Sequence, residues 1–279
     1  MLGRQVITRH LLADQLRNLG IEPGGVLVVH ASFRAVGPIE DGPPGLIGAL
    51  HEVLGPSGTL VMPSMSGSRR TDPYDLARTP TREMGVVAET FWRMSGTLRS
   101  DHPTSSFAAN GPLAREITAP QPLSPGHGLA SPIGRVYRLG GSILLLGVGH
   151  DANTTIHLAE SIAQVPYHIR KWATMLRDGM PERVEYEETD HCCRNFALVD
   201  GWLRQRGLQT EGTVGGAMAR LMRSKEVVET VAPRLRQDPL RFLCLPNAGC
   251  EECDAARRSV ASRGISPEQM RRDDAPGDG

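Results

Sequence analysis

The sequence has few aromatic residues, no excess of charge of either sign and no long hydrophobic run. Phenylalanine, tryptophan and tyrosine together make up 4% of its 279 residues, and 31 lysines and arginines balance 31 aspartates and glutamates. It has no basic stripe with interleaved aromatic residues that could follow a phosphate backbone, so we expect no nucleic-acid partner. No apolar run approaches the roughly 18 residues needed to cross a bilayer, so we expect no membrane association.

Cysteine is scarce as well, and its distribution argues against a disulfide framework. The N-terminus, M-L-G-R-Q-V-I-T-R-H, lacks the apolar core of a signal peptide, so we expect a cytoplasmic protein. An odd number of thiols in such a chain favours reduced cysteines or a metal site over paired disulfides. The thiols all lie in the last third of the chain, at Cys192, Cys193, Cys244, Cys250 and Cys253.

What the sequence does contain is an alternation of apolar runs and amphipathic segments, which predicts an α/β fold with a central, mostly buried sheet and flanking helices. The runs at residues 25–33 and 142–148 show little polar alternation, as in strands covered on both faces. Further strands are predicted at 59–62 and 241–245, and helices at 8–19, 46–54, 85–94, 154–163 and 216–235. We expect a single domain over residues 1–259 and a flexible C-terminal tail over residues 260–279.

The segment G-V-G-H-D-A-N-T-T-I-H-L-A-E, residues 147–160, concentrates polar residues after an apolar run. It suggests a nucleotide loop, but the third glycine of G-x-G-x-x-G is missing. Asn153, Thr154 and Thr155 are typical of a helix start, where free N–H groups can bind an anion or a carbonyl oxygen. His157 and Glu160 share a helix face, so the carboxylate can orient the imidazole and raise its basicity. A buried histidine that only satisfies a hydrogen bond fits this spacing equally well.

Two sets of residues have the chemistry of metal ligands. His150, Asp151 and His157 could hold the metal of a hydrolase, although their spacing matches no common ligand pattern. The C-E-E-C segment at 250–253 is half of a zinc site, and D-H-C-C at 190–193 could supply the other half. This pattern predicts a structural zinc, with unligated thiols as the alternative; its ligands would be Cys192, Cys193, Cys250 and Cys253.

Polar residues in two further places could contact a charged ligand. His30, Ser32 and Arg34 follow the first predicted strand and could hold a phosphorylated cofactor, or they could form a turn with a solvated arginine. Five acids between residues 182 and 190 would attract a polycationic ligand, or they could form a solvated face.

Several long motifs occur in the same order as in a known family. They are V-H-A-S-F-R-A-V-G (29–37), D-G-P-P-G-L-I (41–47), G-T-L-V-M-P-S (58–64), R-S-D-H-P (99–103), L-L-L-G-V-G-H-D-A-N-T-T-I-H-L-A-E (144–160), D-H-C-C (190–193) and A-G-C-E-E-C-D-A-A-R (248–257). Through these motifs, residues 12–259 of the chain resemble the aminoglycoside 3-N-acetyltransferases. Among them, the chain is most similar to the type IV enzymes that acetylate apramycin and gentamicin.

The resemblance implies a fold of the antibiotic N-acetyltransferase type, distinct from the GNAT acetyltransferases. It also implies acetyl-CoA as the donor and the 3-amino group of the 2-deoxystreptamine ring of an aminoglycoside as the acceptor. His157 matches the catalytic histidine of the family. The segment that meets coenzyme A matches Ala31, Ser32 and Phe33, next to His30.

Three acids match positions that line the aminoglycoside pocket or assist the base in the family; they are Glu160, Glu188 and Asp190. The chain departs from the family in two places. The family reads H-S-S where this chain has His30-Ala31-Ser32, and Ser68-Arg69-Arg70 stand where the family has an acid. Two arginines beside a cationic substrate predict a narrower or weaker drug range.

An aminoglycoside amine is largely protonated at neutral pH and must lose a proton before it attacks a thioester. We therefore predict direct acetyl transfer with His157 as the general base, oriented by Glu160 or Asp190. We expect the oxyanion to accept hydrogen bonds from N–H groups of residues 153–155 or from the hydroxyl of Ser105. We also assign Ser105 to the cofactor-binding residues.

Other functions and routes stay open at this point. A covalent route would use Cys192 or Cys193, activated by His191. The remaining alternatives are the metal-dependent hydrolase, an acetyltransferase for a different amine, and a binding module without catalysis.

Overall fold

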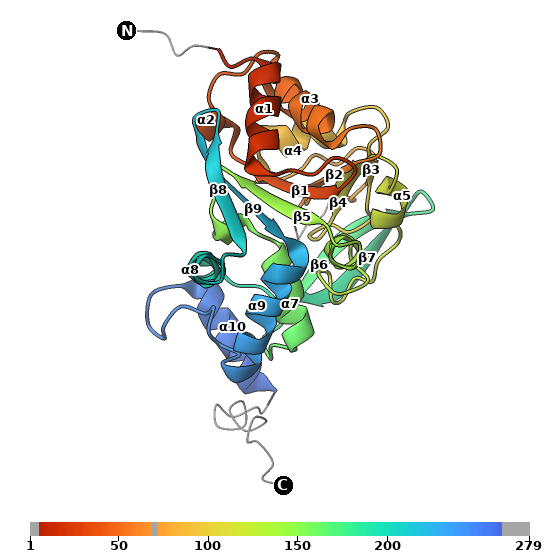
Figure 1. Ribbon diagram of the computed structural model, residues 1–279. Helices are drawn as coiled ribbons and strands as arrows, with labels where there is room; N and C mark the ends of the chain where they lie inside the picture. The colour runs from red at the N-terminus through yellow and green to blue at the C-terminus, as the bar shows by residue number, and fades with distance from the viewer. Residues whose placement is uncertain (1–5, 68–71, 264–279) are drawn as a thin grey trace.

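The computed structural model describes residues 6–67 and 72–263, and its described part contains one large mixed sheet (Figure 1). Its strand order is β3-β4-β2-β1-β5-β9-β8. β1 (Val26–Ala31) pairs in parallel with β2 (Thr59–Pro63) and with β5 (Ser142–Leu146) at the centre. The outer strands pair antiparallel; they are β3 (Leu98–Arg99), β4 (Phe107–Asn110), β8 (Gln209–Val214) and β9 (Ala217–Arg223).

Helices cover both faces of this sheet, which confirms the predicted α/β fold. Val26 and Val28 of β1 pack into one apolar cluster and Leu27 and Val29 into another, because successive side chains of a strand point to opposite faces. The second cluster contains α1 (Arg9–Leu19), α3 (Gly42–Leu54) and α4 (Gly85–Trp92). The first contains α5 (Ala114–Ile117), α6 (Pro132–Arg138), α7 (Thr155–Ala163), α8 (Leu198–Gln205), α9 (Ser224–Gln237) and α10 (Glu251–Ser262).

Local signals explain where the helices begin and end. The Thr8 hydroxyl accepts the Leu11 N–H at the start of α1, and Gly20, with φ 105°, ends that helix in the left-handed region. Three further elements are short; they are α2 (Phe33–Val36) and the 3₁₀ turns η1 (His150–Ala152) and η2 (Arg194–Ala197).

The three parallel strands end at the same edge of the sheet. The connection from β1 to β2 passes through α3 on one face, whereas α6, which precedes β5, lies on the other face. In open α/β sheets a crevice forms at such a point, outside the carboxyl ends of the strands, and ligands bind there. The segments that follow β1, β2 and β5 are therefore the first place to look for a site.

A separate hairpin, β6 (Ile169–Arg177) with β7 (Met180–Glu188), forms a second sheet (Figure 1). Tyr74, in the segment that follows β2, forms a bridge with Met175 of β6. Asp178 and Gly179, with φ 52° and 79°, form the turn of the hairpin, as is typical of two-residue hairpin loops. β7 ends at Glu188 and delivers residues 189–193 to the crevice.

Two predicted elements were wrong. Residues 217–223 form β9 rather than the start of a helix, because they pair with β5 on one side and β8 on the other; only α9 within 216–235 is helical. No strand is present at 241–245. α10 continues to Ser262, so residues 260–262 of the predicted tail belong to a helix. Residues 264–279 of that predicted tail and the Ser68-Arg69-Arg70 segment lie outside the described residues. Within 6–67 and 72–263, no helix has the length and apolarity that a bilayer span requires.

Candidate active site

His157, in the first turn of α7, lines two neighbouring pockets at the carboxyl edge of the sheet. The β1 pocket has a volume of about 480 Å³, and its lining includes His30, Ala31 and Ser32. The acidic pocket has a volume of about 410 Å³, and its lining includes four carboxylates and two basic side chains: Glu83, Glu188, Asp190, Glu252, Arg82 and Lys171. Both pockets share His157, Thr154, Met65, Glu83 and Met84.

Glu160 lies beneath His157, fully buried, and binds it directly. His157 Nδ1 is 2.6 Å from Glu160 Oε2, so the N–H at this position donates to the carboxylate. The other carboxylate oxygen, Oε1, accepts the Tyr167 hydroxyl at 2.6 Å and lies 2.8 Å from His191 Nε2. Burial opposes the charge of Glu160, but His191 and His157 hold the pKa of this carboxyl well below its usual value. Glu160 is therefore an anion that fixes the ring of His157.

The second ring nitrogen of His157, Nε2, lies 3.5 Å from Cys193 Sγ. Burial alone would lower the pKa of His157, but the Cys193 sulfur and the Glu160 carboxylate raise it well above its ordinary value. The His127 ring stacks on the His157 ring at a centroid distance of 5.2 Å. Burial, followed by the charge of His157, lowers the pKa of His127 to about 3, so His127 is neutral.

In the acidic pocket Lys171 binds both predicted substrate acids. Its Nζ lies 3.0 Å from Glu188 Oε2 and 2.9 Å from Asp190 Oδ2. Glu188 Oε1 also accepts the hydroxyls of Ser105, at 2.7 Å, and of Thr104. Burial opposes ionisation of Glu188, but Lys171 lowers the pKa of this carboxyl to about 2. Glu188 is therefore charged at neutral pH, and Lys171 orients both carboxylates.

Of the residues that sequence reasoning had assigned to cofactor binding, His30, Ala31 and Ser32 line the β1 pocket, whereas Phe33 and Ser105 do not. His30 is buried, and burial lowers its pKa to about 4; its Nε2 lies 3.4 Å from Thr154 Oγ1. Phe33 begins α2 and packs against the apolar cluster that contains α1, α3 and α4 instead of lining the β1 pocket. Ser105 is buried and its hydroxyl donates to Glu188, so it lies next to the acidic pocket.

The roles predicted for two acids and one N–H group also differ from the geometry. Asp190 binds Lys171 and not His157, so it does not orient the base. Glu160 is enclosed by His157, His191 and Tyr167 and lines neither pocket. The Thr155 N–H donates to Asn153 Oδ1 at 3.2 Å and is not free for an oxyanion.

The hydrolase ligand set is not assembled. His150 is buried, with Nε2 2.9 Å from Gln209 Oε1 and Nδ1 3.3 Å from Asn153 Nδ2, whereas Asp151 is exposed. Neither residue belongs to a group that could hold a metal ion within the described ranges.

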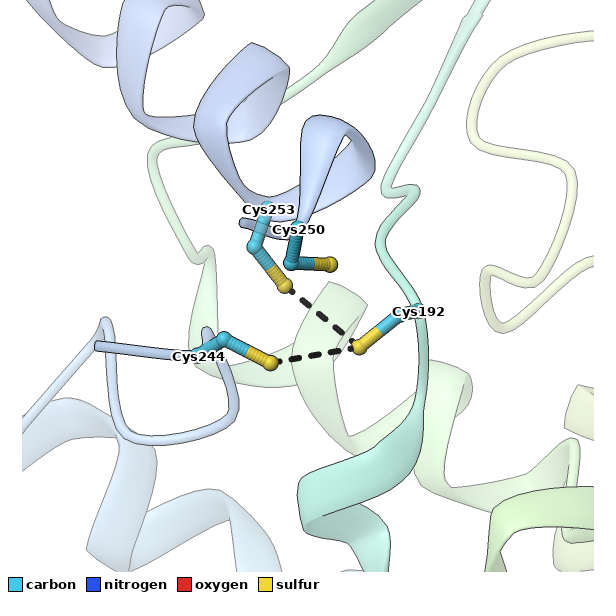
Figure 2. Close-up of side chains that lie close together, drawn as sticks. All are labelled: Cys192, Cys244, Cys250 and Cys253. Carbon is cyan, nitrogen blue, oxygen red and sulfur yellow. Dashed lines mark hydrogen bonds between the residues drawn. The ribbon is translucent and has the colours of Figure 1, made fainter. Parts of the chain in front are cut away.

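The predicted zinc ligands are corrected at one position. Cys192, Cys250 and Cys253 converge with Cys244, and Figure 2 shows these four side chains together. Cys193 points to His157 instead. His191 cannot activate a thiol either, because Nε2 faces Glu160 and Nδ1 accepts the Cys193 N–H at 3.1 Å. His191 supports Glu160.

Sequence reasoning missed residues that complete the site, above all Lys171, Tyr167 and His127. Lys171 and Tyr167 carry no motif. Tyr167 lies between α7 and β6 and Lys171 lies in β6, so their contacts with Glu160 and Glu188 follow only from the tertiary fold. His127 stands in the irregular segment S-P-G-H-G, where a histidine between glycines was a usable signal for a functional loop.

Comparison with known proteins identifies relatives of this chain. Residues 28–236 match the family model described as aminoglycoside 3-N-acetyltransferase. Over 240 residues the chain is 56% identical to aminoglycoside N(3)-acetyltransferase IV of Salmonella sp, covering 85% of this chain and 91% of that protein.

Two solved enzymes show the same fold with ligands. A histidine-to-alanine variant of AAC(3)-IVa in complex with a gentamicin has a TM-score of 0.88 at 54% identity, covering 93% of this chain and 100% of that chain. The same variant with apramycin has a TM-score of 0.82 at 52% identity, covering 90% and 100%. AAC-IIIb with CoASH has a TM-score of 0.79 at 28% identity, covering 83% and 97%.

Proposed function

The chain belongs to the aminoglycoside 3-N-acetyltransferase family, and we propose that it transfers the acetyl group of acetyl-CoA to the 3-amino group of the 2-deoxystreptamine ring in gentamicin- and apramycin-type aminoglycosides. Such an enzyme confers antibiotic resistance. We place it in the cytoplasm, which supplies acetyl-CoA.

The observation that carries this proposal is the position of His157 between two pockets of different chemistry. The β1 pocket takes the thioester end of acetyl-CoA, since its lining is mostly apolar and includes the Ala31–Ser32 segment. The acidic pocket takes the aminoglycoside, because a polycation is attracted to clustered carboxylates. A group shared by both pockets can reach the acceptor amine and the thioester together, which is what transfer requires.

Direct transfer follows from the two hydrogen-bonding positions of His157. Glu160 holds Nδ1, so the neutral ring presents Nε2 as a base. The bound 3-ammonium group first releases one proton to solvent. Nε2 then takes a second proton from the amine while its nitrogen attacks the acetyl carbonyl and the C–N bond forms. The C–S bond breaks, and the coenzyme A thiolate leaves and takes that proton from the imidazolium.

The charge on the carbonyl oxygen needs a donor in the transition state. Thr154 lines both pockets and lies at the N-terminus of α7, where the helix dipole favours negative charge. With the Thr155 N–H already bound, we assign this role to the Thr154 hydroxyl.

The acids of the acidic pocket position the substrate. Asp190 has a side chain that is 43% exposed and can bind a substrate ammonium alongside Lys171, while Glu188 is buried and maintains the negative field. Glu160 stays a positioning residue for His157. The arginines at 69 and 70 are proposed to limit the range of drugs accepted.

A covalent route is the second candidate, and the 3.5 Å distance between Cys193 Sγ and His157 Nε2 favours it. Here the Cys193 thiolate attacks the acetyl carbonyl, and coenzyme A leaves with the proton from His157. The amine, which has lost one proton to solvent, then gives a second proton to His157 and attacks the acetyl-cysteine, whose C–S bond breaks and restores the Cys193 thiolate. This route predicts ping-pong kinetics and an enzyme heavier by one acetyl group after incubation with acetyl-CoA alone. Direct transfer predicts sequential kinetics, no acetylated enzyme, and turnover within about 10-fold of the parent in Cys193→Ala, compared with losses near 10²-fold or more for a lost nucleophile.

The function itself is tested by release of the coenzyme A thiol when the protein is mixed with acetyl-CoA and an aminoglycoside. We expect release with gentamicin and apramycin, with the product acetylated at the 3-amino group by NMR. Release only with simpler amines would indicate an acetyltransferase for a different amine. Binding without release would indicate a non-catalytic module.

A further inference from the structure

Four of the five cysteines converge on one point outside the pockets (Figure 2). Cys192 follows the hairpin, Cys244 lies in the segment after α9, Cys250 precedes α10, and Cys253 lies in its first turn. The thiols thus come from two distant parts of the chain, position 192 and the stretch 244–253. Contacts of the protein alone give no reason for such convergence, since four thiols hydrogen-bond only weakly to one another.

The spacing of the sulfurs fits a tetrahedral metal ion. All four Sγ atoms lie within 4.8 Å of one another, and Cys192 Sγ is 3.5 Å from Cys244 Sγ and 3.6 Å from Cys253 Sγ. Zinc bound at about 2.3 Å by four thiolates places the sulfurs roughly 3.8 Å apart. A disulfide instead needs about 2.05 Å, and the cysteines are unpaired.

Two of the four sulfurs lie at the start of a helix. Cys250 is the N-cap residue of α10 and Cys253 lies in its first turn, where free backbone N–H groups favour a thiolate. Arg257, one turn after Cys253, donates from its guanidinium to the Cys244 carbonyl and brings a positive charge close to the cluster.

We propose that Cys192, Cys244, Cys250 and Cys253 bind one structural zinc ion. Sulfur-only tetrahedral ligation selects zinc or iron among common metals, and all four positions are filled by protein, so the ion has no open position for catalysis. The site goes beyond the proposed acetyl transfer and does not depend on it.

The ion would act on the active site through the chain on either side of Cys192. His191 precedes it and binds Glu160, and Cys193 follows it and contacts His157. A metal at Cys192 therefore fixes the segment that supports the catalytic pair and ties it to α10.

The first test is the metal content of the full-length protein purified without chelator from zinc-supplemented cells. We expect about one zinc ion per chain by inductively coupled plasma mass spectrometry of the acid-digested protein. The Cys192→Ser, Cys244→Ser, Cys250→Ser and Cys253→Ser variants should each lose most of the zinc and melt at lower temperature. Cys193→Ser is the matched control, a neighbouring thiol outside the cluster, and should keep the zinc of the parent.

A second test needs no variant to fold. Titrating the parent protein with a mercurial that binds thiols should release zinc, detected with a colorimetric chelator, in step with modification of four sulfurs. Replacing zinc with cobalt(II) should give the visible bands of a tetrahedral thiolate complex. A folded protein without metal, a protein containing iron, a disulfide among these cysteines, or equal zinc loss in Cys193→Ser would overturn the proposal.

Discussion

The exchange of Glu160 for glutamine tests how the site sets the basicity of His157. The glutamine side chain has nearly the same shape as the glutamate and could still accept the Tyr167 hydroxyl, but it has no negative charge. An opposite charge at this range raises the pKa of an imidazole by about 1–3 units. In Glu160→Gln we therefore expect the pKa of His157 to fall by that amount, because the carboxylate 2.6 Å from Nδ1 is lost.

The assay is the pH dependence of kcat/KM for an aminoglycoside, followed by release of coenzyme A thiol. Only the neutral imidazole can accept a proton, so the rate rises with pH through the pKa of His157. The acid limb of Glu160→Gln should move to lower pH by about 1–3 units, while its plateau falls because the base is weaker and less well oriented. Ionisation of the substrate amine is common to both proteins, so it cancels in the comparison.

Tyr167→Phe is the matched control for this experiment. It removes a hydrogen bond to the same carboxylate and keeps the charge. Its acid limb should stay close to that of the parent. An unmoved acid limb in Glu160→Gln, or an equal shift in Tyr167→Phe, would refute the reasoning, because Glu160 would then act only through packing. Titration of the His157 ring by NMR in the same variants gives the pKa without turnover.

Three further predictions follow from the same contacts. His157→Ala should lower kcat by at least about 10²-fold, the usual scale for a general base, with the Kd of acetyl-CoA by calorimetry little changed. Asp190→Asn should raise the KM for the aminoglycoside about 3- to 10-fold and leave the KM for acetyl-CoA unaltered, since one partly exposed charge pair is lost. Acidification should lower the Tm from pH 6.5 downward. Burial lowers the pKa of His30 to about 4 and of His127 to about 3, so below pH 6.5 the unfolded chain binds protons that the native state does not bind. In differential scanning calorimetry His30→Asn should reduce the dependence of Tm on pH in this range, and an unchanged dependence would contradict the account.

His157 and Glu160 contribute to the stability of the fold in opposite ways as the pH changes. The raised pKa of His157 stabilises the fold below its unfolded value of 6.5, and this contribution is lost as pH rises through the native pKa. The lowered pKa of Glu160 stabilises the fold above its unfolded value of 4.5, and this contribution is lost as pH falls through the native pKa. Their attraction therefore contributes most in the mildly acidic range between the two unfolded values.

The central sheet and the His157–Glu160 pair could be predicted because both depend on local spacing. A spacing of three places two side chains on one helix face whatever the rest of the fold does. The hairpin was missed although Asp178-Gly179 is a strong turn signal, since the acids around it favoured a solvated face. β9 was missed because the apolar pattern of the segment A-M-A-R-L-M-R fits both a helix and a strand, and only its pairing with β5 and β8 makes it a strand.

The error in the cysteine set has a simple physical cause. Neighbouring side chains of an irregular or extended segment leave the backbone in different directions, so Cys192 and Cys193 could not both face one ion. Cys244 lies 52 residues further along the chain from Cys192, in a segment without regular structure, and no spacing rule links the two. Which thiol turns to the other three cysteines and which to His157 depends on tertiary structure alone.

Lys171 explains how the acidic pocket keeps two charged carboxylates close together without substrate. Glu188 and Asp190 would repel each other, and a buried Glu188 without a cation would take up a proton. Lys171 lies between the two carboxylates and keeps Glu188 charged before the drug arrives, so Glu188 need not lose a proton on binding. One lysine does not neutralise two acids, and the remaining negative charge, next to Glu83 and Glu252, is left for the ammonium groups of the substrate. The pocket therefore selects ligands with several positive charges, because a single amine would gain little in a site that already contains one.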